Sequence, residues 1–265
     1  MTEAAVVLYN KDPRGVATIT LNRPEVHNAF NDDVINLLRE AINDSAADND
    51  VRAVVLRSNG KNFSAGADLR MMKSSVNSTR DENYANSKDM GRMFHTLNNM
   101  PKPVIALVQG SAFGGALGLI ACCDIAIASQ DAAFCLSEVK IGLAPAVISP
   151  FVVAALGERA ARRYFQTAEK ISAAKAAELG LVHELVESAE SFDEALFPIL
   201  KSILCNAPGA VAKSKELVQN VSRAAIDEDI LGYTAEIIAD LRIADEGQEG
   251  LSAFFEKRKP HWIKS

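Results

Sequence analysis

Three short segments of this 265-residue chain carry residue types that could do chemistry. Two of them, Lys61–Leu69 and Phe113–Ala116, are turns of small residues that each follow a strand pattern and precede a helix pattern. Small residues let a ligand approach the main chain, and the first N–H groups of a helix have no partner within it. Two such donors converging on one point would form an oxyanion hole, which stabilises a carbonyl oxygen as it gains negative charge. The third segment places an acid, Glu138, just after the apolar run 133–136.

Other catalytic patterns are missing from the sequence. The turn Gly110–Gly118 lacks the glycine spacing of a dinucleotide-binding loop and the Lys-Ser/Thr pair of a P-loop. No G-x-S-x-G elbow occurs, and the four histidines are too scattered to predict a metal site or a catalytic triad. A small-residue loop or a single acid is more often structural than functional. The residues by themselves therefore predict a carbonyl- or anion-binding site without identifying a reaction.

Composition narrows the class of protein further. With 48% hydrophobic and 23% charged residues the chain is average for a globular protein, and its length suits one large domain or two small ones. The formal net charge of −6 argues against a nucleic-acid binder. The longest apolar stretches are shorter than the roughly 18 residues of a membrane span, and the start has no signal-peptide pattern. The four cysteines have no zinc-like spacing, so we expect buried free thiols and a cytoplasmic protein.

The spacing of apolar residues predicts strands and helices in the first half of the chain and mostly helices in the second half. The expected strands are Val6–Tyr9, Val16–Leu21, Val51–Leu56, Val104–Val108, Asp124–Ser129, Ala133–Leu136 and Leu181–Val186. A turn-rich segment between the first two strands predicts a hairpin. The expected helices are Asn31–Ile42, the end of Ser74–Asn99, Gly115–Cys122, Arg159–Gln166, Ser172–Leu179, Asp193–Asn206, Gly209–Ala225, Asp227–Ala244 and Gly250–Lys257.

In these segments the chain resembles the enoyl-CoA hydratase/isomerase (crotonase) superfamily over almost its full length. The resemblance rests on six stretches that occur in order, namely Leu21–Pro24 with Asn28–Ala29, Phe63–Asp68, Val108–Asp124, Ser137–Glu138 with Gly142–Pro145, Ala177–Val182 and Phe254–Lys259. It implies an α/β fold, a crotonase-type spiral of β-β-α units with a C-terminal helical trimerisation region, assembled as a homotrimer or a dimer of trimers. On this resemblance, residues 1–200 form the spiral core that binds acyl-CoA and carries catalysis, and residues 201–265 form the helical oligomerisation region.

The family's site residues carry over to matching positions of this sequence. The resemblance implies that the backbone N–H groups of Ala67 and Gly115 hold the thioester oxygen of an acyl-CoA and that Glu138 is the catalytic acid and base. It also implies substrate and CoA contacts at Val26, His27, Ser64, Ala65, Ala67, Asp68, Leu69, Gly114, Gly115, Phe255 and Lys257. The basic run 257–259 lies either near the CoA phosphates or in a solvated tail. Coenzyme A is part of the substrate, so we expect no separate cofactor and no metal.

One position departs from the two-carboxylate hydratases of this superfamily. The helix after the glycine turn carries a second glutamate in those enzymes, whereas this chain has Gly118 there. One interpretation is hydration with Glu138 as the sole base and then acid. A second is Δ3,Δ2-enoyl-CoA isomerisation, in which Glu138 moves a proton between C2 and C4. A third is a CoA-thioester-binding protein with little hydratase activity, or one with other thioester-enolate chemistry. The sequence leaves all three open.

The missing glutamate also suggests a substrate. Its absence should leave room beside the reacting carbons and remove a negative charge, which suits a branched acyl group that bears its own carboxylate. The segment Leu136–Pro150 is similar to the hydratases of leucine and acyclic-terpene breakdown, which act on methylglutaconyl-CoA or isohexenylglutaconyl-CoA. We therefore expect a hydratase of the methylglutaconyl-CoA type, with Lys140, Arg70 and Lys73 as candidates to bind the substrate carboxylate.

Overall fold

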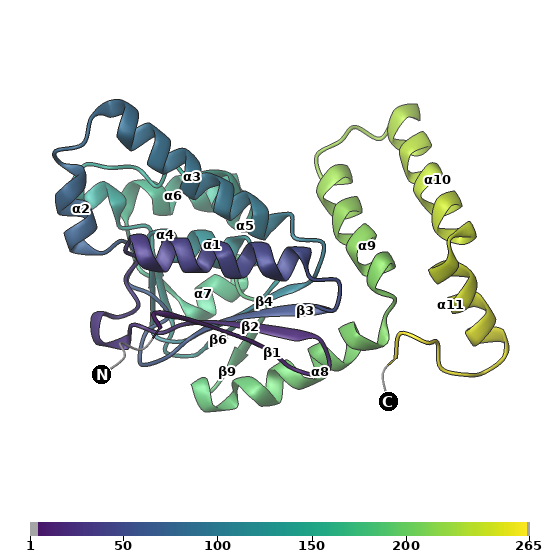
Figure 1. The fold of residues 1–265 in the computed structure, drawn as a ribbon. Coiled ribbons are helices and arrows are strands. Elements are labelled where there is room, and N and C mark those ends of the chain that lie inside the picture. The colour runs from purple at the N-terminus through teal and green to yellow at the C-terminus, as the bar shows by residue number, and fades with distance from the viewer. Residues whose placement is uncertain (1–4, 264–265) are drawn as a thin grey trace.

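The computed structural model of the chain describes residues 5–263, except for the side chains of Leu69, Ser74 and Ser75. Its larger β-sheet contains six strands, ordered β1 (Val7–Lys11), β2 (Val16–Leu21), β3 (Ala53–Ser58), β4 (Val104–Val108), β6 (Ile125–Ser129) and β9 (Glu184–Val186) (Figure 1). The pair β1–β2 is antiparallel, which confirms the predicted hairpin. All other neighbouring pairs of this sheet are parallel.

A smaller sheet lies at the end of the large one and contains β5 (Ser111–Phe113), β7 (Ala133–Cys135) and β8 (Ile171–Ser172). The chain passes from β4 of the large sheet to β5 of the small sheet, and later from β6 to β7 in the same way. A helix follows each of these strand pairs, so the β-β-α order expected for the first half is present. The strand β5 was not expected, because three residues between glycines give no alternating pattern to detect.

The helices cover both faces of the large sheet. They are α1 (Asp32–Ala47), α2 (Leu69–Ser75), α3 (Arg80–Asn98), α4 (Gly115–Ala121), α5 (Ser149–Leu156), α6 (Glu158–Thr167), α7 (Ala173–Glu178), α8 (Phe192–Cys205), α9 (Pro208–Val221), α10 (Glu228–Ile243) and α11 (Asp245–Phe255). The predicted helices are confirmed, with ends shifted by a few residues. The helix α5 was not expected, because its run of apolar residues has no polar face and therefore no helical period.

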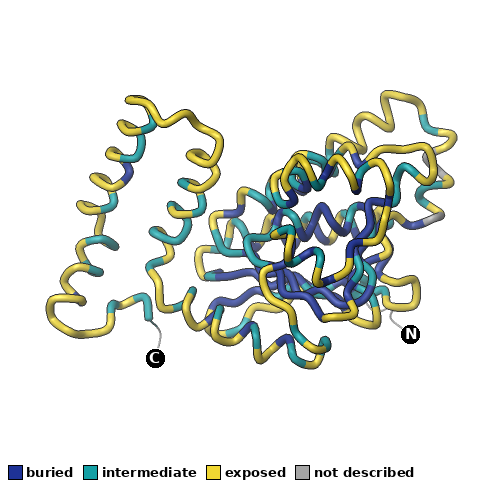
Figure 2. Tube along the Cα trace, turned by 180° about the vertical axis from the view of Figure 1, so that it is seen from behind, coloured by how far each residue is buried: buried dark blue, intermediate teal, exposed yellow. Residues whose placement is uncertain are grey.

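Alternating side chains of the central strands point into two separate apolar layers. Val54 and Leu56 of β3 face the larger layer beneath α1, α3 and α4, whereas Val55 faces a smaller layer beneath α8. Successive residues of a strand point to opposite faces, so a strand that is apolar throughout is buried on both sides. Figure 2 shows these strands as the most continuously buried part of the chain. This rigid sheet fixes the loops that leave its strand ends.

The last three helices stand beside the sheet rather than on it (Figure 1). The helix α10 packs against α9 and α11, and the tube in Figure 2 is mostly exposed or half-buried along all three. The division predicted between residues 200 and 201 stays a prediction, and it falls inside α8. Within the described residues no single helix is long and apolar enough to cross a membrane, although one helix pair bent by 106° passes that test together.

The four cysteines are free thiols, as expected. Cys122 and Cys135 are buried and Cys123 is half-buried. The expectation of burial is wrong for Cys205, which is exposed because it ends α8 where the chain leaves the sheet.

Candidate active site

The two small-residue loops run side by side in the structure. Ser64 of the first loop and Ala112 of β5 form a parallel bridge, in which Ser64 N donates to Ser111 O at 3.0 Å and Phe113 N donates to Ser64 O at 3.0 Å. Three residues beyond each bridge partner lie Ala67 and Gly115. The residues just before them are close together, because a Cβ on Gly66 would lie 2.7 Å from Phe113 O and 3.8 Å from Gly114 Cα.

A second bridge directs the N–H group of Ala67 away from Phe30. Phe30 N donates to Gly66 O at 2.7 Å, and Asp68 N donates to Phe30 O at 2.9 Å. In a parallel bridge the residue between these two contacts directs its own N–H to the opposite side. No described residue accepts a hydrogen bond from Ala67 N, so this donor is available to a ligand.

The second donor, Gly115 N–H, belongs to the first residue of α4 and therefore has no acceptor within the helix. The preceding residue is held on both sides, since Gly114 N donates to Cys135 O at 2.9 Å and Gly114 O accepts from Leu117 N at 2.9 Å. Gly114 has φ +53°, a conformation that other residues rarely adopt. Among residues 5–263, none accepts from Gly115 N.

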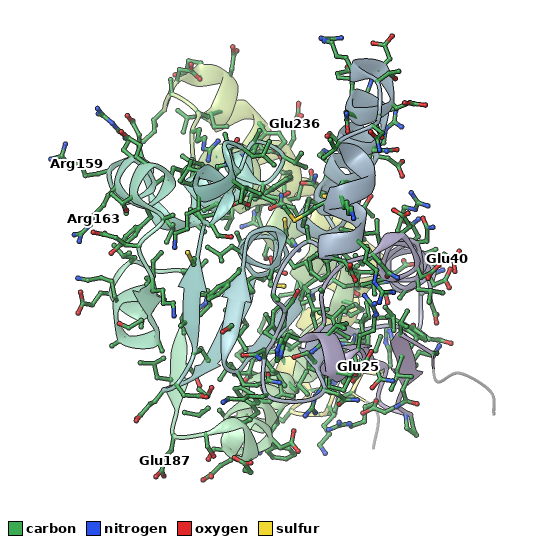
Figure 3. All side chains as sticks on the ribbon, turned by 90° about the vertical axis from the view of Figure 1, so that its left-hand side faces the viewer. Glu25, Glu40, Arg159, Arg163, Glu187 and Glu236 are labelled. Atoms are coloured by element: carbon green, nitrogen blue, oxygen red, sulfur yellow. The ribbon has the colours of Figure 1, made fainter. Side chains whose placement is uncertain are left out.

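Glu138 follows β7, at the start of the short 3-10 turn Glu138–Ile141, and lies beside these donors. A Cβ placed on Gly114 would be 3.3 Å from Glu138 Oε1. Oε2 is buried and has no hydrogen-bond partner in the described part of the chain, and burial raises the pKa of the carboxyl group. Most charged side chains project from the surface instead, as Glu40 and Arg159 do in Figure 3. A half-buried acid with one unpartnered oxygen, close to the glycine turn that carries a free N–H group, is suited to general acid–base catalysis.

The prediction that Gly118 leaves room beside the reacting carbons is wrong. A Cβ on Gly118 would lie 2.3 Å from Ile148 Cγ2 and 2.9 Å from Phe94 Cε1, distances that real contacts essentially never show. Both side chains are almost fully buried. Two apolar side chains from α3 and the start of α5 therefore fill the space that a second acid would need. The other consequence expected of Gly118, that this position carries no negative charge, is unaffected.

Several predicted CoA contacts lie next to one another. Val26 ends the 3-10 turn Pro24–Val26 and is 38% exposed, and His27 follows it in the left-handed conformation. Ala65 N donates to His27 O at 2.9 Å, which joins this turn to the first oxyanion loop. The turn and the loop thus form one continuous edge beside Ala67.

Two predicted contacts of that loop have structural partners instead of free groups. Ser64 is fully buried, and its hydroxyl donates to Asn28 O at 2.8 Å. Asp68 pairs with Arg23 at 3.2 Å, and its pKa is lowered by the hydrogen bond from Arg70 N and by Arg23. Leu69 begins α2, and its side chain lies outside the described part of the structure. CoA contacts at these positions stay predictions.

The structure does not bring Phe255 and Lys257 to the oxyanion loops of the same chain. Phe255 is the last residue of α11, which lies beyond α9 in Figure 1, and is 76% exposed, and Lys257 follows the end of that helix. The basic run that contains Lys257 is partly neutralised, because Arg258 pairs with Glu249 at 2.6 Å. A contact of this segment with CoA bound to its own chain has no support in the structure.

The three candidate partners of a substrate carboxylate are all exposed. Lys140 lies in the turn after Glu138, and Arg70 and Lys73 lie on α2. The structure adds a fourth cation that the sequence did not predict. Lys170 Nζ lies 6.0 Å from the centre of the ring of Phe113, at the start of the second oxyanion loop. Sequence spacing could not reveal it, because the pairing of β8 with β7 brings it near.

Comparison with known proteins gives the family. The family model described as enoyl-CoA hydratase/isomerase matches residues 11–265. The chain belongs to the enoyl-CoA hydratase/isomerase family. It is accordingly an enoyl-CoA hydratase-family enzyme that acts on acyl-CoA thioesters, and its fold is the crotonase fold with mixed sheets and C-terminal helices.

Relatives within the enoyl-CoA hydratase/isomerase family match over nearly the whole chain. A short-chain-enoyl-CoA hydratase from Clostridium acetobutylicum is 34% identical and covers 98% of both chains. An enoyl-CoA hydratase structure from Shewanella pealeana is 44% identical with a TM-score of 0.94, covering 98% of this chain and 97% of that one. The structure of AtuE from Pseudomonas aeruginosa is 34% identical with a TM-score of 0.92, covering 98% of this chain and 100% of that one.

Proposed function

We propose that this protein hydrates a branched, carboxylated 2-enoyl-CoA thioester of the methylglutaconyl-CoA type, with one catalytic acid. The observation that carries the proposal is the half-buried carboxyl of Glu138, whose Oε2 has no partner and whose Oε1 lies close to Gly114, together with the free N–H groups of Ala67 and Gly115. The two donors bind the thioester oxygen where charge develops, and the acid moves the protons.

Each step of the proposed reaction assigns a task to a group on the chain. Glu138 takes a proton from water as the water oxygen bonds to C3 of the enoyl group. The electrons of the double bond move onto the thioester, whose oxygen becomes an enolate held by Ala67 N–H and Gly115 N–H. Losing one such donor would cost about 3 kcal/mol of transition-state stabilisation. Glu138 then returns the proton to C2, which completes the addition of water. We place the CoA portion along Val26 and His27.

The preference for a branched substrate has a different basis from that expected on the sequence. Ile148 and Phe94 fill the place of a second acid with apolar side chains, which carry no charge to repel a substrate carboxylate and offer it no partner. The substrate carboxylate must then reach a cation at the mouth of the site, for which Lys140, Arg70 and Lys73 remain the candidates. The resemblance of the segment Leu136–Pro150 to the hydratases of leucine and acyclic-terpene breakdown supports a substrate of this kind.

Isomerisation is the second candidate function, and the single acid is the observation that favours it. Moving a double bond from C3 to C2 needs one base that takes a proton from C2 and returns it to C4, with no activated water. Glu138 alone satisfies that requirement. A CoA-thioester-binding role with little hydratase activity is the third candidate.

We also propose a homotrimer or a dimer of trimers in the cytoplasm. The last two helices and the turn before them expose large apolar side chains, including Ile243 of α10 at 78%, Phe254 of α11 at 78% and Ile226 of the turn between α9 and α10 at 92%. Exposed apolar groups of this number are typical of interaction surfaces. A second copy that covers them would also bring a foreign C-terminal segment close to each site, and the four free thiols fit a reducing compartment.

A substrate panel tests the proposal. The protein is incubated with 3-methylglutaconyl-CoA, crotonyl-CoA and a linear 3-enoyl-CoA in water labelled with heavy oxygen, and enoyl-thioester absorbance and product mass are followed. We expect loss of absorbance and uptake of label with 3-methylglutaconyl-CoA, and slower hydration of crotonyl-CoA. Conversion of only the 3-enoyl substrate without label would replace hydratase by isomerase.

Two variants serve as controls for the panel. Glu138→Gln should abolish turnover and leave CoA affinity nearly unchanged, because the acid does not contact the nucleotide. Glu184→Gln, on the exposed residue of β9, should match the wild type. Wild-type turnover by Glu138→Gln would overturn the mechanism, and no turnover by the wild type with any substrate would favour the binding role.

A further inference from the structure

Phe30 lies beside both proposed oxyanion donors. Its N–H donates to Gly66 O at 2.7 Å and its carbonyl oxygen accepts from Asp68 N at 2.9 Å, one hydrogen bond on either side of Ala67. Phe30 precedes Asn31, whose side chain caps α1 by accepting from Val34 N. The first donor is therefore tied through Phe30 to the start of a long helix.

The side chain of Phe30 lies next to the second donor. A Cβ placed on Gly115 would be 3.5 Å from Phe30 Cε2 and 3.6 Å from Cδ2, so the ring leaves space for little more than one methyl group beside this glycine. The ring is 4% exposed and belongs to the larger apolar layer. It thus bounds the space beside the first residue of α4 while its own backbone holds the neighbouring loop.

A buried ion pair locks the same arrangement from the other side. Arg23 Nη1 donates to Ala29 O at 2.7 Å and to Asp68 Oδ2 at 3.2 Å, with 16% and 11% of the two side chains exposed. The residues just before Phe30 and just after Ala67 are therefore held together. The bridge between Phe30 and Ala67 has little freedom to shift unless this pair breaks.

We infer that Phe30 is a positioning residue that sets the separation of the Ala67 and Gly115 N–H groups. This inference rests on the proposed oxyanion hole. The main-chain bridge is available to any residue at this position, whereas the support of Gly115 requires the ring. Shortening the side chain should leave Ala67 in place and let the start of α4 move, so that the two donors no longer converge on one oxygen. Displacing a donor by about 1 Å can cost up to roughly 100-fold in rate.

The test uses Phe30→Leu and Phe30→Ala in the full chain. We expect kcat to fall about tenfold in the first variant and about 100-fold in the second, with KM within about threefold of wild type. The carbonyl stretch of bound butyryl-CoA, labelled at the thioester carbon, should be lowered in frequency by the wild type. In the two variants the carbonyl frequency should return towards that of free butyryl-CoA, and it should return further in Phe30→Ala than in Phe30→Leu.

Phe192 provides the matched control, because it is 2% exposed and lies in the other apolar layer beneath α8. Phe192→Leu should lower the melting temperature without changing kcat or the carbonyl frequency. The inference is overturned if Phe30→Leu and Phe30→Ala also change only the melting temperature. A wild type that lowers the carbonyl frequency but hydrates no substrate would refute the proposed hydration. The carbonyl frequencies of the Phe30 variants would still test whether Phe30 positions the two donors. A wild type that binds butyryl-CoA without lowering it would refute both.

Discussion

At Glu138, burial makes ionisation unfavourable in the folded state and ties the stability of the protein to pH. The pKa of this carboxyl is raised above its ordinary value of 4.5, mainly by burial. The folded state therefore holds a proton over a pH range in which the unfolded state has lost it. Stability from this group is complete below the ordinary pKa and is lost as the pH rises through the raised pKa.

Glu138→Gln should remove that loss. We expect the free energy of unfolding of the variant to fall less between about pH 4 and pH 8 than that of the wild type, because the amide does not ionise. Urea denaturation at a series of pH values measures this. Parallel curves for the two proteins would show that Glu138 is not held in a destabilising environment.

Two glycines in helices should respond oppositely to alanine. Gly118→Ala should lower the free energy of unfolding by about 1–3 kcal/mol, because its Cβ would collide with Ile148. Gly232, in α10, has no atom within 4 Å of a Cβ, so Gly232→Ala should raise stability by roughly 0.5–1 kcal/mol. Adding Ile148→Ala to Gly118→Ala should relieve the collision in part, because it removes the atoms that the new methyl group meets. Equal effects of the two glycine substitutions in urea denaturation would contradict the packing described.

The residue-scale predictions from sequence succeeded where a local pattern carries the signal. Glycine at position 114 and small residues before α2 marked two loops that the structure brings together. The identity of the groups packed behind them could not be predicted in this way. Ile148 lies 30 positions from Gly118, and Phe30 lies 85 positions from Gly115, so only the folded chain shows that they meet.

At the scale of elements, α9 is attached to the sheet body through an ion pair of limited exposure. Lys215 Nζ lies 2.8 Å from Asp124 Oδ2, with 13% and 29% of the side chains exposed, and the same oxygen accepts from Val104 N at the start of β4. Lys215 thus connects α9 to the strand that leads to the second oxyanion loop.

Lys215→Met should lower the free energy of unfolding by about 1–2 kcal/mol, since it leaves Asp124 without its cation in a half-buried position. Lys213 on the same helix forms an exposed pair with Glu216, and Lys213→Met should change stability by less than about 0.5 kcal/mol. Chemical denaturation compares the two. A loss for Lys213→Met as large as that for Lys215→Met would refute a special role of the buried pair.

Elements with a regular apolar period, and short apolar runs bounded by turn residues, were predictable from sequence, whereas elements with neither signal were not. Val104–Val108 was predicted with its observed bounds because it is apolar throughout and bounded by breakers. By contrast α5 is apolar on all sides and β5 has three residues, so neither shows a period. Their structure is fixed by the layers that surround them.

At the scale of the whole molecule, Arg52 joins the sheet body to both ends of the helical tail. Its guanidinium donates to Asn206 O at 2.7 Å, just after α8, and to Trp262 O at 3.1 Å, near the end of the described chain. Arg52 is half-buried, and this desolvation lowers the pKa of its guanidinium. Trp262 Nε1 in turn donates to Cys205 O at 3.1 Å.

Arg52→Met should release the C-terminal segment before the sheet unfolds. Trp262 is the sole tryptophan, so its fluorescence should shift to longer wavelength at a lower urea concentration than the loss of helical circular dichroism. Arg57→Met, at an exposed and more distant pair, should leave the two transitions coincident. Coincident transitions in Arg52→Met would contradict this anchoring.

The central claim is that Ala67 and Gly115 stabilise a thioester enolate while Glu138 alone moves the proton. The most direct measurement is exchange of the C2 hydrogens of a saturated acyl-CoA in D2O, followed by mass spectrometry with wild type and Glu138→Gln. Enolate formation needs no double bond, so the result does not depend on whether hydration or isomerisation is the natural reaction. The account predicts deuterium uptake with the wild type and none above background with Glu138→Gln at equal binding. Equal uptake by both proteins would contradict it.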